Sequence, residues 1–163
     1  MTAQPTDADR WAALGFGPPA AGLPDTPPPF SEAWALDSGE LGSLDPVITQ
    51  DDVAAYLEGM GEPAAAFGAD VPSAFLARMY ARIMSANVVR TDPSIHTSSR
   101  ISHFRRVELG DPISVRGHIE RLFGRRGNRY YVLDMAYLNE SGEIVMTQRH
   151  TAIYRLRSRT AHS

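Results

Sequence analysis

The sequence has no cysteine, no lysine and no long run of apolar residues. Without cysteine, the chain has neither a disulfide framework nor a thiolate that acts as a nucleophile or holds a metal. No apolar stretch approaches the roughly 20 residues that a membrane-spanning helix needs. The first residues lack the basic start and apolar core of a signal peptide. These absences favour a soluble cytoplasmic protein without a membrane partner.

The charged residues are unevenly distributed along the chain. Residues 1–62 contain eleven acidic residues against the single Arg10, whereas residues 90–163 contain thirteen arginines against seven acidic residues. A basic half suits an anionic ligand such as the phosphates of coenzyme A. The alternatives are arginines on the solvent face of a sheet, or an acidic arm that folds back on the basic half. Because most of the arginines fall in expected strands or turns and no nucleic-acid-binding motif is present, we expect no nucleic-acid partner.

Residues 1–45 form an N-terminal arm rich in proline, glycine and alanine. Consecutive prolines remove backbone donors and favour an extended chain, so these runs are neither helix nor central strand. The aromatic side chains of the arm leave two alternatives, packing on the domain or a partner, and disorder: Trp11, Phe16, Phe30 and Trp34. We expect the folded domain over residues 46–157 and a short C-terminal tail over 158–163.

Two helices are expected at the start of the domain. Thr49 before three polar residues is typical of a helix N-cap, and apolar residues recur at helical spacing until Gly61 ends this first helix. A longer helix is expected over residues 72–86, with Pro72 in its first turn, where no donor is lost. Its apolar stripe has the width that a central helix needs when a sheet wraps around it.

From residue 95 onward the pattern changes to strands. Four long segments are separated by turn residues: residues 96–109, 112–123, 129–139 and 144–156. Short turns join most of them, so they are expected to be antiparallel neighbours. The sequence therefore predicts an α+β fold, with helices on one face of a sheet.

Two motifs carry a resemblance to a known family. Residues 56–67 hold Tyr56, a helical gap, Gly61-Glu62-x-Ala-Ala and finally Phe67, while residues 103–111 read His-Phe-Arg-Arg-Val-Glu-Leu-Gly-Asp. They resemble the Tyr…Gly-Asp-x-Asn-Pro-Ile/Leu-His and Phe-x-Arg-Pro-Val-x-x-Gly-Asp motifs of the MaoC-like (R)-specific enoyl-thioester hydratases and dehydratases. With the order of helices and strands, the resemblance covers roughly residues 45–157. It implies a hot-dog fold, in which an antiparallel sheet wraps a long central helix.

The chain departs from the family pattern at the positions that the resemblance implies to be catalytic. Glu62 stands at the Asp position and Phe67 at the His position; in the second motif, His103 and Arg106 replace Phe and Pro. Glu62 has the chemistry of a base, but Phe67 cannot transfer a proton. The alternative interpretation makes Glu62 a solvated acid at a helix end and Phe67 part of the core. In these respects the chain is similar to the degenerate N-terminal-type domain of two-domain or two-subunit hydratases, which is implied to supply a wall of the acyl tunnel.

Several other residues are candidates for a site. Asp92 and His96 place an acid and an imidazole four residues apart before the first long strand, although a turn acid and a strand-start histidine are the favoured interpretation. Three histidines on expected strands, at 103, 118 and 150, have no spacing that indicates a metal site. The candidates for substrate binding are two motif residues and four arginines suited to the phosphates of coenzyme A: Tyr56, Phe67, Arg105, Arg106, Arg125 and Arg126.

The sequence thus predicts a catalytically degenerate subunit of an enoyl-CoA hydratase or 3-hydroxyacyl dehydratase assembly. It would bind an acyl thioester, with coenzyme A or an acyl carrier as part of the substrate and no cofactor of its own. The alternatives are a stand-alone hydratase or dehydratase (a lyase) that uses Glu62 or Asp92 and His96, and a hot-dog thioesterase. Because an exposed sheet edge disfavours a lone monomer, we expect a homodimer, or a heterodimer with an intact MaoC-like subunit.

Overall fold

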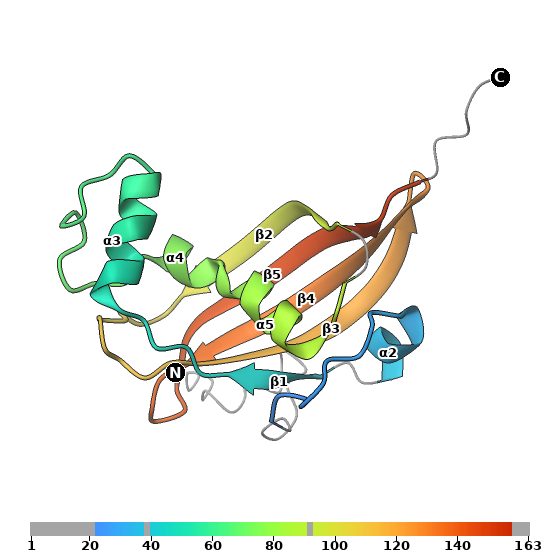
Figure 1. The fold of residues 1–163 in the computed structure, drawn as a ribbon, viewed down its shortest axis with the longest axis horizontal. Coiled ribbons are helices and arrows are strands. Elements are labelled where there is room, and N and C mark those ends of the chain that lie inside the picture. The colour runs from blue at the N-terminus through green and yellow to red at the C-terminus, as the bar shows by residue number, and fades with distance from the viewer. Residues whose placement is uncertain (1–21, 38–39, 91–92, 158–163) are drawn as a thin grey trace, which may run out of the picture.

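The computed structural model describes residues 22–37, 40–90 and 93–157. They contain one antiparallel sheet with the strand order β1-β3-β4-β5-β2, so that β1 and β2 form its two edges (Figure 1). The strands are β1 (Glu40–Leu44), β2 (Ile95–His103), β3 (Ser114–Arg125), β4 (Asn128–Leu138) and β5 (Ile144–Arg155).

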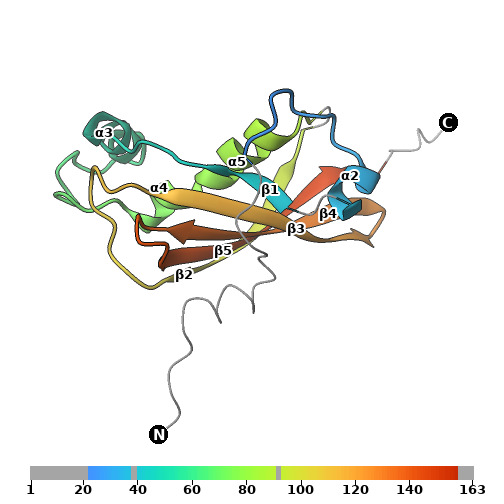
Figure 2. The same cartoon turned by 90° about the horizontal axis from the view of Figure 1, so that it is seen from below.

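Two helices run in succession over one face of this sheet, and a third lies beyond one end of the strands (Figures 1 and 2). The first two are α4 (Ser73–Ala77) and α5 (Met79–Asn87), and the third is α3 (Gln50–Gly59). A short helix, α2 (Glu32–Asp37), packs beside β3. Helices on one face of an antiparallel sheet confirm the predicted α+β class.

Helix α3 begins where its capping residue predicts. The Thr49 hydroxyl accepts a hydrogen bond from the backbone N–H of Asp52, and the Asp52 carboxylate accepts one from the backbone N–H of Thr49. This reciprocal pair is a capping box, which satisfies two donors that the helix leaves free. The hydrogen bond from the Thr49 side chain also lowers the pKa of Asp52.

The central helix differs from the single helix expected over residues 72–86. It is divided at Arg78, where the Arg78 N–H bonds to the carbonyl of Phe75 and the Ala81 N–H bonds to the carbonyl of Arg78. Bonds between residues three apart tighten the helix locally and interrupt its regular ladder. Pro72 occupies the N-cap of α4 instead of its first turn.

The end of α5 is fixed by the side chain of Asn87, which is buried against β1. Its amide oxygen accepts from the Gly42 N–H at 2.6 Å, and its amide nitrogen donates to the carbonyls of Gly42 and Ile83 at 3.1 and 2.9 Å. A side-chain methyl group at Gly42 would lie 2.6 Å from the carbonyl oxygen of Gly22. Asn87 and Gly42 therefore join α5 to the edge strand β1, and only glycine fits at position 42.

The described part of the N-terminal arm packs on the domain. Phe30 lies against Tyr154, with ring centroids 5.1 Å apart, and contacts Trp34 edge-on. Glu32 accepts hydrogen bonds from the Tyr154 hydroxyl and from Arg129, which lowers its pKa. Of the two alternatives for the arm, packing therefore holds for these residues, whereas Trp11 and Phe16 lie outside the described part of the chain.

Strand β2 is shorter than the segment expected over residues 96–109. The strand ends at His103, although the N–H groups of Phe104 and Arg105 still donate to the carbonyl of Val145 in β5. Residues 107–109 bond instead to the chain before α4. The Val71 N–H donates to the carbonyl of Val107, and the Leu109 N–H donates to the carbonyl of Ala69, each at 2.8 Å. The sequence pattern predicts one strand up to residue 109. It gives no sign that residues 107–109 bond to residues 69–71, because that segment lies far away in the sequence.

Candidate functional site

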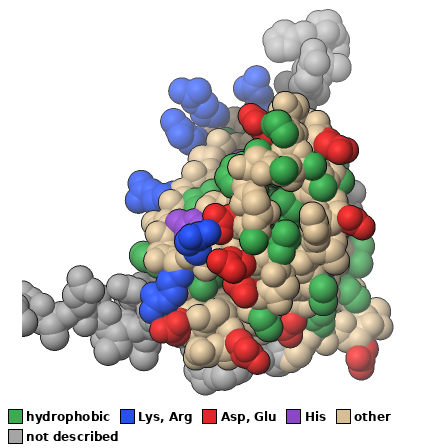
Figure 3. Space-filling view, turned by 90° about the vertical axis from the view of Figure 1, so that its left-hand side faces the viewer, with side chains coloured by type: hydrophobic (Ala, Val, Ile, Leu, Met, Phe, Trp, Pro, Cys, Tyr) green, Lys and Arg blue, Asp and Glu red, His purple; other side chains and the backbone are tan. Residues whose placement is uncertain are grey.

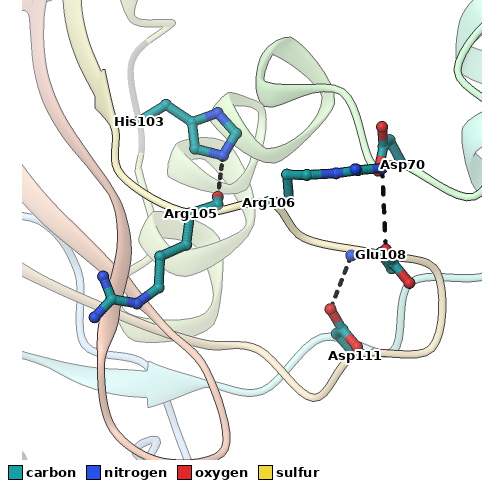
Figure 4. A network of polar contacts seen from close by, with 6 residues as sticks. All are labelled: Asp70, His103, Arg105, Arg106, Glu108 and Asp111. Carbon is teal, nitrogen blue, oxygen red and sulfur yellow. Dashed lines mark hydrogen bonds and ion pairs between the residues drawn. The ribbon is translucent and has the colours of Figure 1, made fainter.

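The two motifs that carry the family resemblance lie side by side. The loop between α3 and α4 (residues 60–72) and the segment after β2 (residues 104–111) are joined by the backbone bonds described above and by the bridge from Asp70 to Glu108. Arg106 bonds to Asp70 at 2.6 Å and lies 4.0 Å from Glu108 (Figure 4). The two sequence motifs are thus one structural unit, which we call the motif junction.

Both arginines of the second motif face acidic groups of the chain. Arg105 donates two hydrogen bonds to Glu143, at 2.9 and 3.3 Å, and together with Asn139 it lowers the pKa of Glu143 to about 2. The hydrogen bond to Asp70 raises the pKa of Arg106. Since the side chain of Arg106 is still 74% exposed, it can reach a ligand more readily than Arg105 can.

The two residues at the positions of the implied catalytic pair lie at the surface. Glu62 is exposed, and its carboxylate has no hydrogen bond or ion pair within the described part of the chain. Phe67 is 47% exposed, so the interpretation that it fills the core is wrong. The turn that contains Phe67 lies outside the sheet, and about half of this side chain is left exposed to solvent. The junction therefore presents an unpaired acid and an aromatic ring, and no proton-transfer pair.

Tyr56 lines a groove between α3 and the central helices. The groove has a volume of about 640 Å³. Phe75 contacts the Tyr56 ring edge-on, and the Arg78 guanidinium lies 5.2 Å from the ring centroid. Acidic and basic side chains face one another across the groove, which is lined in part by Asp51, Asp52, Arg78 and Arg82. A groove with both charges and an aromatic wall suits a ligand that combines polar and apolar parts.

A second polar site lies between α5 and the sheet, near the β2 edge. Its side chains, which we call the histidine cluster, are Tyr80, His96, Ser99, Gln148 and His150. The ring of Tyr80 stacks on His150 with centroids 3.8 Å apart, and His96 stacks on His150 at 4.6 Å. Ser99 lies 3.0 Å from Nε2 of His96 and 3.3 Å from Nδ1 of His150. Ser99 thus connects the two imidazoles.

His150 is the buried member of the histidine cluster. Burial, together with the nearby His96 and Arg90, lowers its pKa to about 4, so the ring is neutral at pH 7. His96 is exposed on β2. Asp92, the residue predicted to act with His96, lies outside the described residues, and the neighbour that the structure gives to His96 is His150.

A third histidine on the same face of β2 lies at the motif junction. Nδ1 of His103 is bonded to the Ser73 hydroxyl, and Nε2 is bonded to the backbone carbonyl of Arg105 (Figure 4). A carbonyl accepts only, so Nε2 carries the proton and Nδ1 accepts from Ser73. The ring is thereby held in one tautomer. Helix α4 and strand β2 are linked at this point.

The remaining predicted arginines lie far from these sites. Arg125 and Arg126 are at the turn between β3 and β4, at the opposite end of the sheet from the motif junction (Figure 1). Arg126 has φ +51° and Gly127 has φ +80°, as a two-residue hairpin turn of the I′ type requires. The structure therefore does not bring all four candidate arginines together.

The outer edge of β2 is open along its whole length. All nine of its residues are exposed, and no strand pairs with this edge in the described part of the chain. Large apolar side chains are exposed on or next to it: Ile95, Ile101 and Phe104. Figure 3 shows the adjoining end of the molecule, where hydrophobic and acidic side chains intermingle and arginines gather along one side.

Two kinds of site are not found among the described residues. No three His, Asp or Glu side chains are grouped so that they would hold a metal ion. No helix in this part of the chain is long and apolar enough to cross a membrane.

Sequence reasoning missed most of the histidine cluster. Tyr80 lies within the helix expected over residues 72–86 and contributes to its apolar stripe, and nothing in the sequence distinguishes Ser99 or Gln148. Alternation along the two strands places Ser99, Gln148 and His150 on one face once the pairing of β2 with β5 is known. His96 joins that face only through the register shift between His96 and Ser98, which the sequence does not indicate.

No protein-family model matches the chain, and none of the curated proteins does. Solved structures do match. HtdX of Mycobacterium tuberculosis has a TM-score of 0.58 and 22% identity over 69% of this chain and 50% of HtdX, so the chain spans half the length of that protein. The HadBC complex of the same organism, a 3R-hydroxyacyl-ACP dehydratase, has a TM-score of 0.57 and 16% identity over 71% of this chain and 96% of that one.

A MaoC-like dehydratase from Rhodospirillum rubrum also matches, with a TM-score of 0.54 and 13% identity over 73% of this chain and 92% of that one. A hypothetical thioesterase from Streptococcus pneumoniae has the same fold. At these identities the likeness shows the fold, and the hot-dog fold predicted from the sequence is confirmed. Dehydratases and a thioesterase share it, so the reaction has to be argued from the site.

Proposed function

We propose that the chain is a cytoplasmic, MaoC-like hot-dog subunit that binds an acyl thioester and forms the catalytically degenerate half of an enoyl-CoA hydratase or 3-hydroxyacyl dehydratase assembly. The observation that carries the proposal is the pair of side chains in the motif loop, an unpaired Glu62 and a Phe67 that cannot transfer a proton. Hydration of an enoyl thioester needs a group that activates water and a group that handles the proton. A chain with only one of them fits a binding role better than a complete catalytic one.

The open edge of β2 supports a partner. An unpaired strand edge is a template for another chain, and apolar residues beside it favour burial. The partner is a second copy of the chain, or an intact MaoC-like subunit that supplies the Asp and His. HadBC, itself a complex of two kinds of subunit by its name, offers a precedent for the second arrangement.

The acyl thioester is the substrate class that best fits the features of this surface. The groove of about 640 Å³ beside Tyr56 has aromatic and charged walls, which suit an apolar chain with a polar carrier. Arg106 is the exposed cation of the motif junction and is our candidate for contact with a phosphate of coenzyme A or of an acyl carrier. The subunit needs no cofactor of its own.

The test is to follow crotonyl-CoA with the purified chain alone, by loss of the enoyl-thioester absorbance and by release of free thiol. We expect binding in isothermal titration calorimetry, no hydration above the buffer rate, and no thiol release. Glu62→Gln is compared with Glu58→Gln, which removes the same charge from helix α3 at a position of the helical gap that the family motif does not specify.

Turnover that disappears in Glu62→Gln and persists in Glu58→Gln would establish a stand-alone enzyme and overturn the degenerate role. Thiol release would establish a thioesterase. Absence of binding to the chain alone and to its assembled form would reject the acyl-thioester assignment itself.

A further inference from the structure

Two arginines of the central helices, Arg78 and Arg82, line the groove beside Tyr56. Both are exposed and stand four residues apart, so they lie about one helical turn from each other. Neither belongs to the sequence motifs that indicated the candidate arginines. The groove, with its volume of about 640 Å³, therefore has two guanidinium groups along one side.

The two guanidinium groups are positioned by the protein without an acidic partner. Arg78 lies over the rings of Tyr56 and Phe75, 5.2 and 5.6 Å from their centroids. Arg82 donates to the thioether sulfur of Met79 at 3.8 Å. Neither arginine has an ion pair with a carboxylate among the described residues. An aromatic ring attracts the charge of a guanidinium but accepts no strong hydrogen bond, and a thioether is a weak acceptor. The N–H donors of both arginines are therefore available to a ligand.

Other arginines of the chain show how such donors are used when an acid is at hand. Glu143 accepts two hydrogen bonds from Arg105, and Asp134 accepts two from Arg149. A phosphate accepts a pair of parallel bonds from a guanidinium in the same way. Arg78 and Arg82 thus have the chemistry that receives phosphate groups from outside the chain.

Two acidic side chains line the same groove and restrict what it accepts. Asp52 already accepts hydrogen bonds from the hydroxyl and the N–H of Thr49, which lower its pKa, and the nearby Arg82 and Arg78 lower it further. Asp51 is exposed and has no hydrogen bond in the described part of the chain. Because carboxylates repel a bare anion, the best ligand combines phosphate groups with a hydrogen-bond donor.

The nucleotide of coenzyme A combines these groups in one molecule. Its diphosphate and its 3′-phosphate suit two guanidinium groups, its adenine amine suits a carboxylate, and its flat base suits a wall with aromatic side chains. A groove of about 640 Å³ is within the size range of ligand sites. The arm of an acyl carrier, by contrast, has a single phosphodiester and no base.

We infer that Arg78 and Arg82 bind phosphate groups of coenzyme A in the groove beside Tyr56, with Asp51 as an acceptor for the adenine amine. The inference rests on the proposed function in taking a thioester as the ligand. It deepens that function by making coenzyme A, and not an acyl carrier, the group that carries the acyl chain. This phosphate site is additional to Arg106, which lies at the motif junction.

The test measures binding to the purified full chain by isothermal titration calorimetry. The first probe is adenosine 3′,5′-bisphosphate, which is the nucleotide half of coenzyme A without the thioester arm. The second is 4′-phosphopantetheine, the arm that coenzyme A and an acyl carrier share. We expect the nucleotide to bind more tightly than the arm. Arg78→Gln and Arg82→Gln should each weaken nucleotide binding about 3- to 10-fold, as the loss of a charge-assisted contact at an exposed position does.

Arg125→Gln is the matched control, because Arg125 is an exposed arginine at the turn between β3 and β4, at the other end of the sheet (Figure 1). It removes the same charge from the chain and should leave nucleotide binding unchanged. Arg82→Gln should keep the native melting temperature, since the Arg82 side chain bonds only to a thioether. A loss of binding in that variant is then a loss of contact with the nucleotide and not of the fold.

The inference is overturned if Arg78→Gln and Arg82→Gln bind the nucleotide as tightly as native chain does, or if Arg125→Gln weakens binding equally. It also fails if 4′-phosphopantetheine binds and the nucleotide does not, because the arginines then serve the arm of an acyl carrier.

Two further outcomes separate the inference from the proposed function. If crotonyl-CoA binds and the nucleotide does not, the inference is rejected and the proposed function stands. If the nucleotide binds through the two arginines but crotonyl-CoA binds no more tightly than coenzyme A, the nucleotide site stands and the acyl part of the proposed function is rejected.

Discussion

The ring of Tyr80 lies stacked on the ring of His150, with centroids 3.8 Å apart and planes inclined by 19°. The contact joins α5 to the sheet through an aromatic pair in which one member, His150, gains a positive charge in acid. Because the imidazole is fully buried, a charge on it would have no water around it. The link between helix and sheet is therefore sensitive to acid.

We predict that the free energy of unfolding decreases as the pH falls from about 6.5 towards 4. The pKa of His150 is lowered from 6.5 to about 4 in the folded state, so the unfolded chain takes up this proton first. The contribution of neutral His150 to the free energy of unfolding is fully present above pH 6.5. Up to about 3 kcal/mol of it is lost as the pH approaches 4. Urea titrations across this range measure it.

The matched variants are His150→Gln, which should flatten the decrease, and His96→Gln, which should retain most of it because His96 is exposed. An equal slope in native chain and His150→Gln would show that other groups cause the acid sensitivity.

Tyr137→Phe is expected to lower the free energy of unfolding by about 1–3 kcal/mol. The Tyr137 hydroxyl donates to the amide oxygen of Gln148 at 2.8 Å, and both residues are buried, so the variant leaves the amide oxygen without a donor. Chemical denaturation measures the loss. Tyr130→Phe is the control, because the Tyr130 hydroxyl has no hydrogen bond in the described part of the chain and the ring stacked on Phe123 is kept. Equal losses in the two variants would contradict the assignment.

Asn87→Ala is expected to lower the free energy of unfolding by at least about 2 kcal/mol, because three hydrogen bonds to buried backbone groups are removed together. Ser85→Ala, at an exposed position of the same helix, should be nearly neutral. Denaturation of both variants gives the comparison. A loss confined to the helix signal in circular dichroism, without cooperative destabilisation, would argue against the link to β1.

Ile101→Arg is expected to convert a dimer into a monomer if the β2 edge is the interface, because it places a charge at an exposed apolar position on that strand. Light scattering after gel filtration measures the mass. Leu156→Arg, which changes an exposed residue beyond β5, is the control and should leave the mass unchanged. A native monomer at high concentration, or a dimer that survives Ile101→Arg, would contradict this interface for a homodimer.

Local signals predicted the parts of the molecule whose partners are near in sequence. Thr49 was predicted as a cap from its neighbours, and its capping box with Asp52 lies within four residues. The predicted end of this strand was wrong because residues 107–109 bond to residues 69–71, and no local feature of the sequence indicates that partner.

The same reason explains what was missed in the candidate site. The contact of Tyr80 with His150 joins residues 70 apart in sequence. The helical periodicity of the apolar residues places Tyr80 on a helix face and does not indicate this contact. Phe67 was open to a core interpretation by residue type alone, and only the fold shows that its turn lies outside the sheet. The family resemblance supplied the fold, but it directed attention to the motif junction and away from the cluster beneath α5.

The strand order has a consequence for how the molecule assembles. The three central strands, β3, β4 and β5, follow one another in sequence, whereas the two edges come from earlier parts of the chain. Contacts between neighbouring segments close short loops and form readily, whereas β1 and β2 must be joined to β3 and β5 over long stretches of chain. The central meander should therefore form first, and the edge amides should be the first to exchange with solvent deuterium. The open edge formed by β2 is thus expected to be among the last parts of the sheet to become ordered.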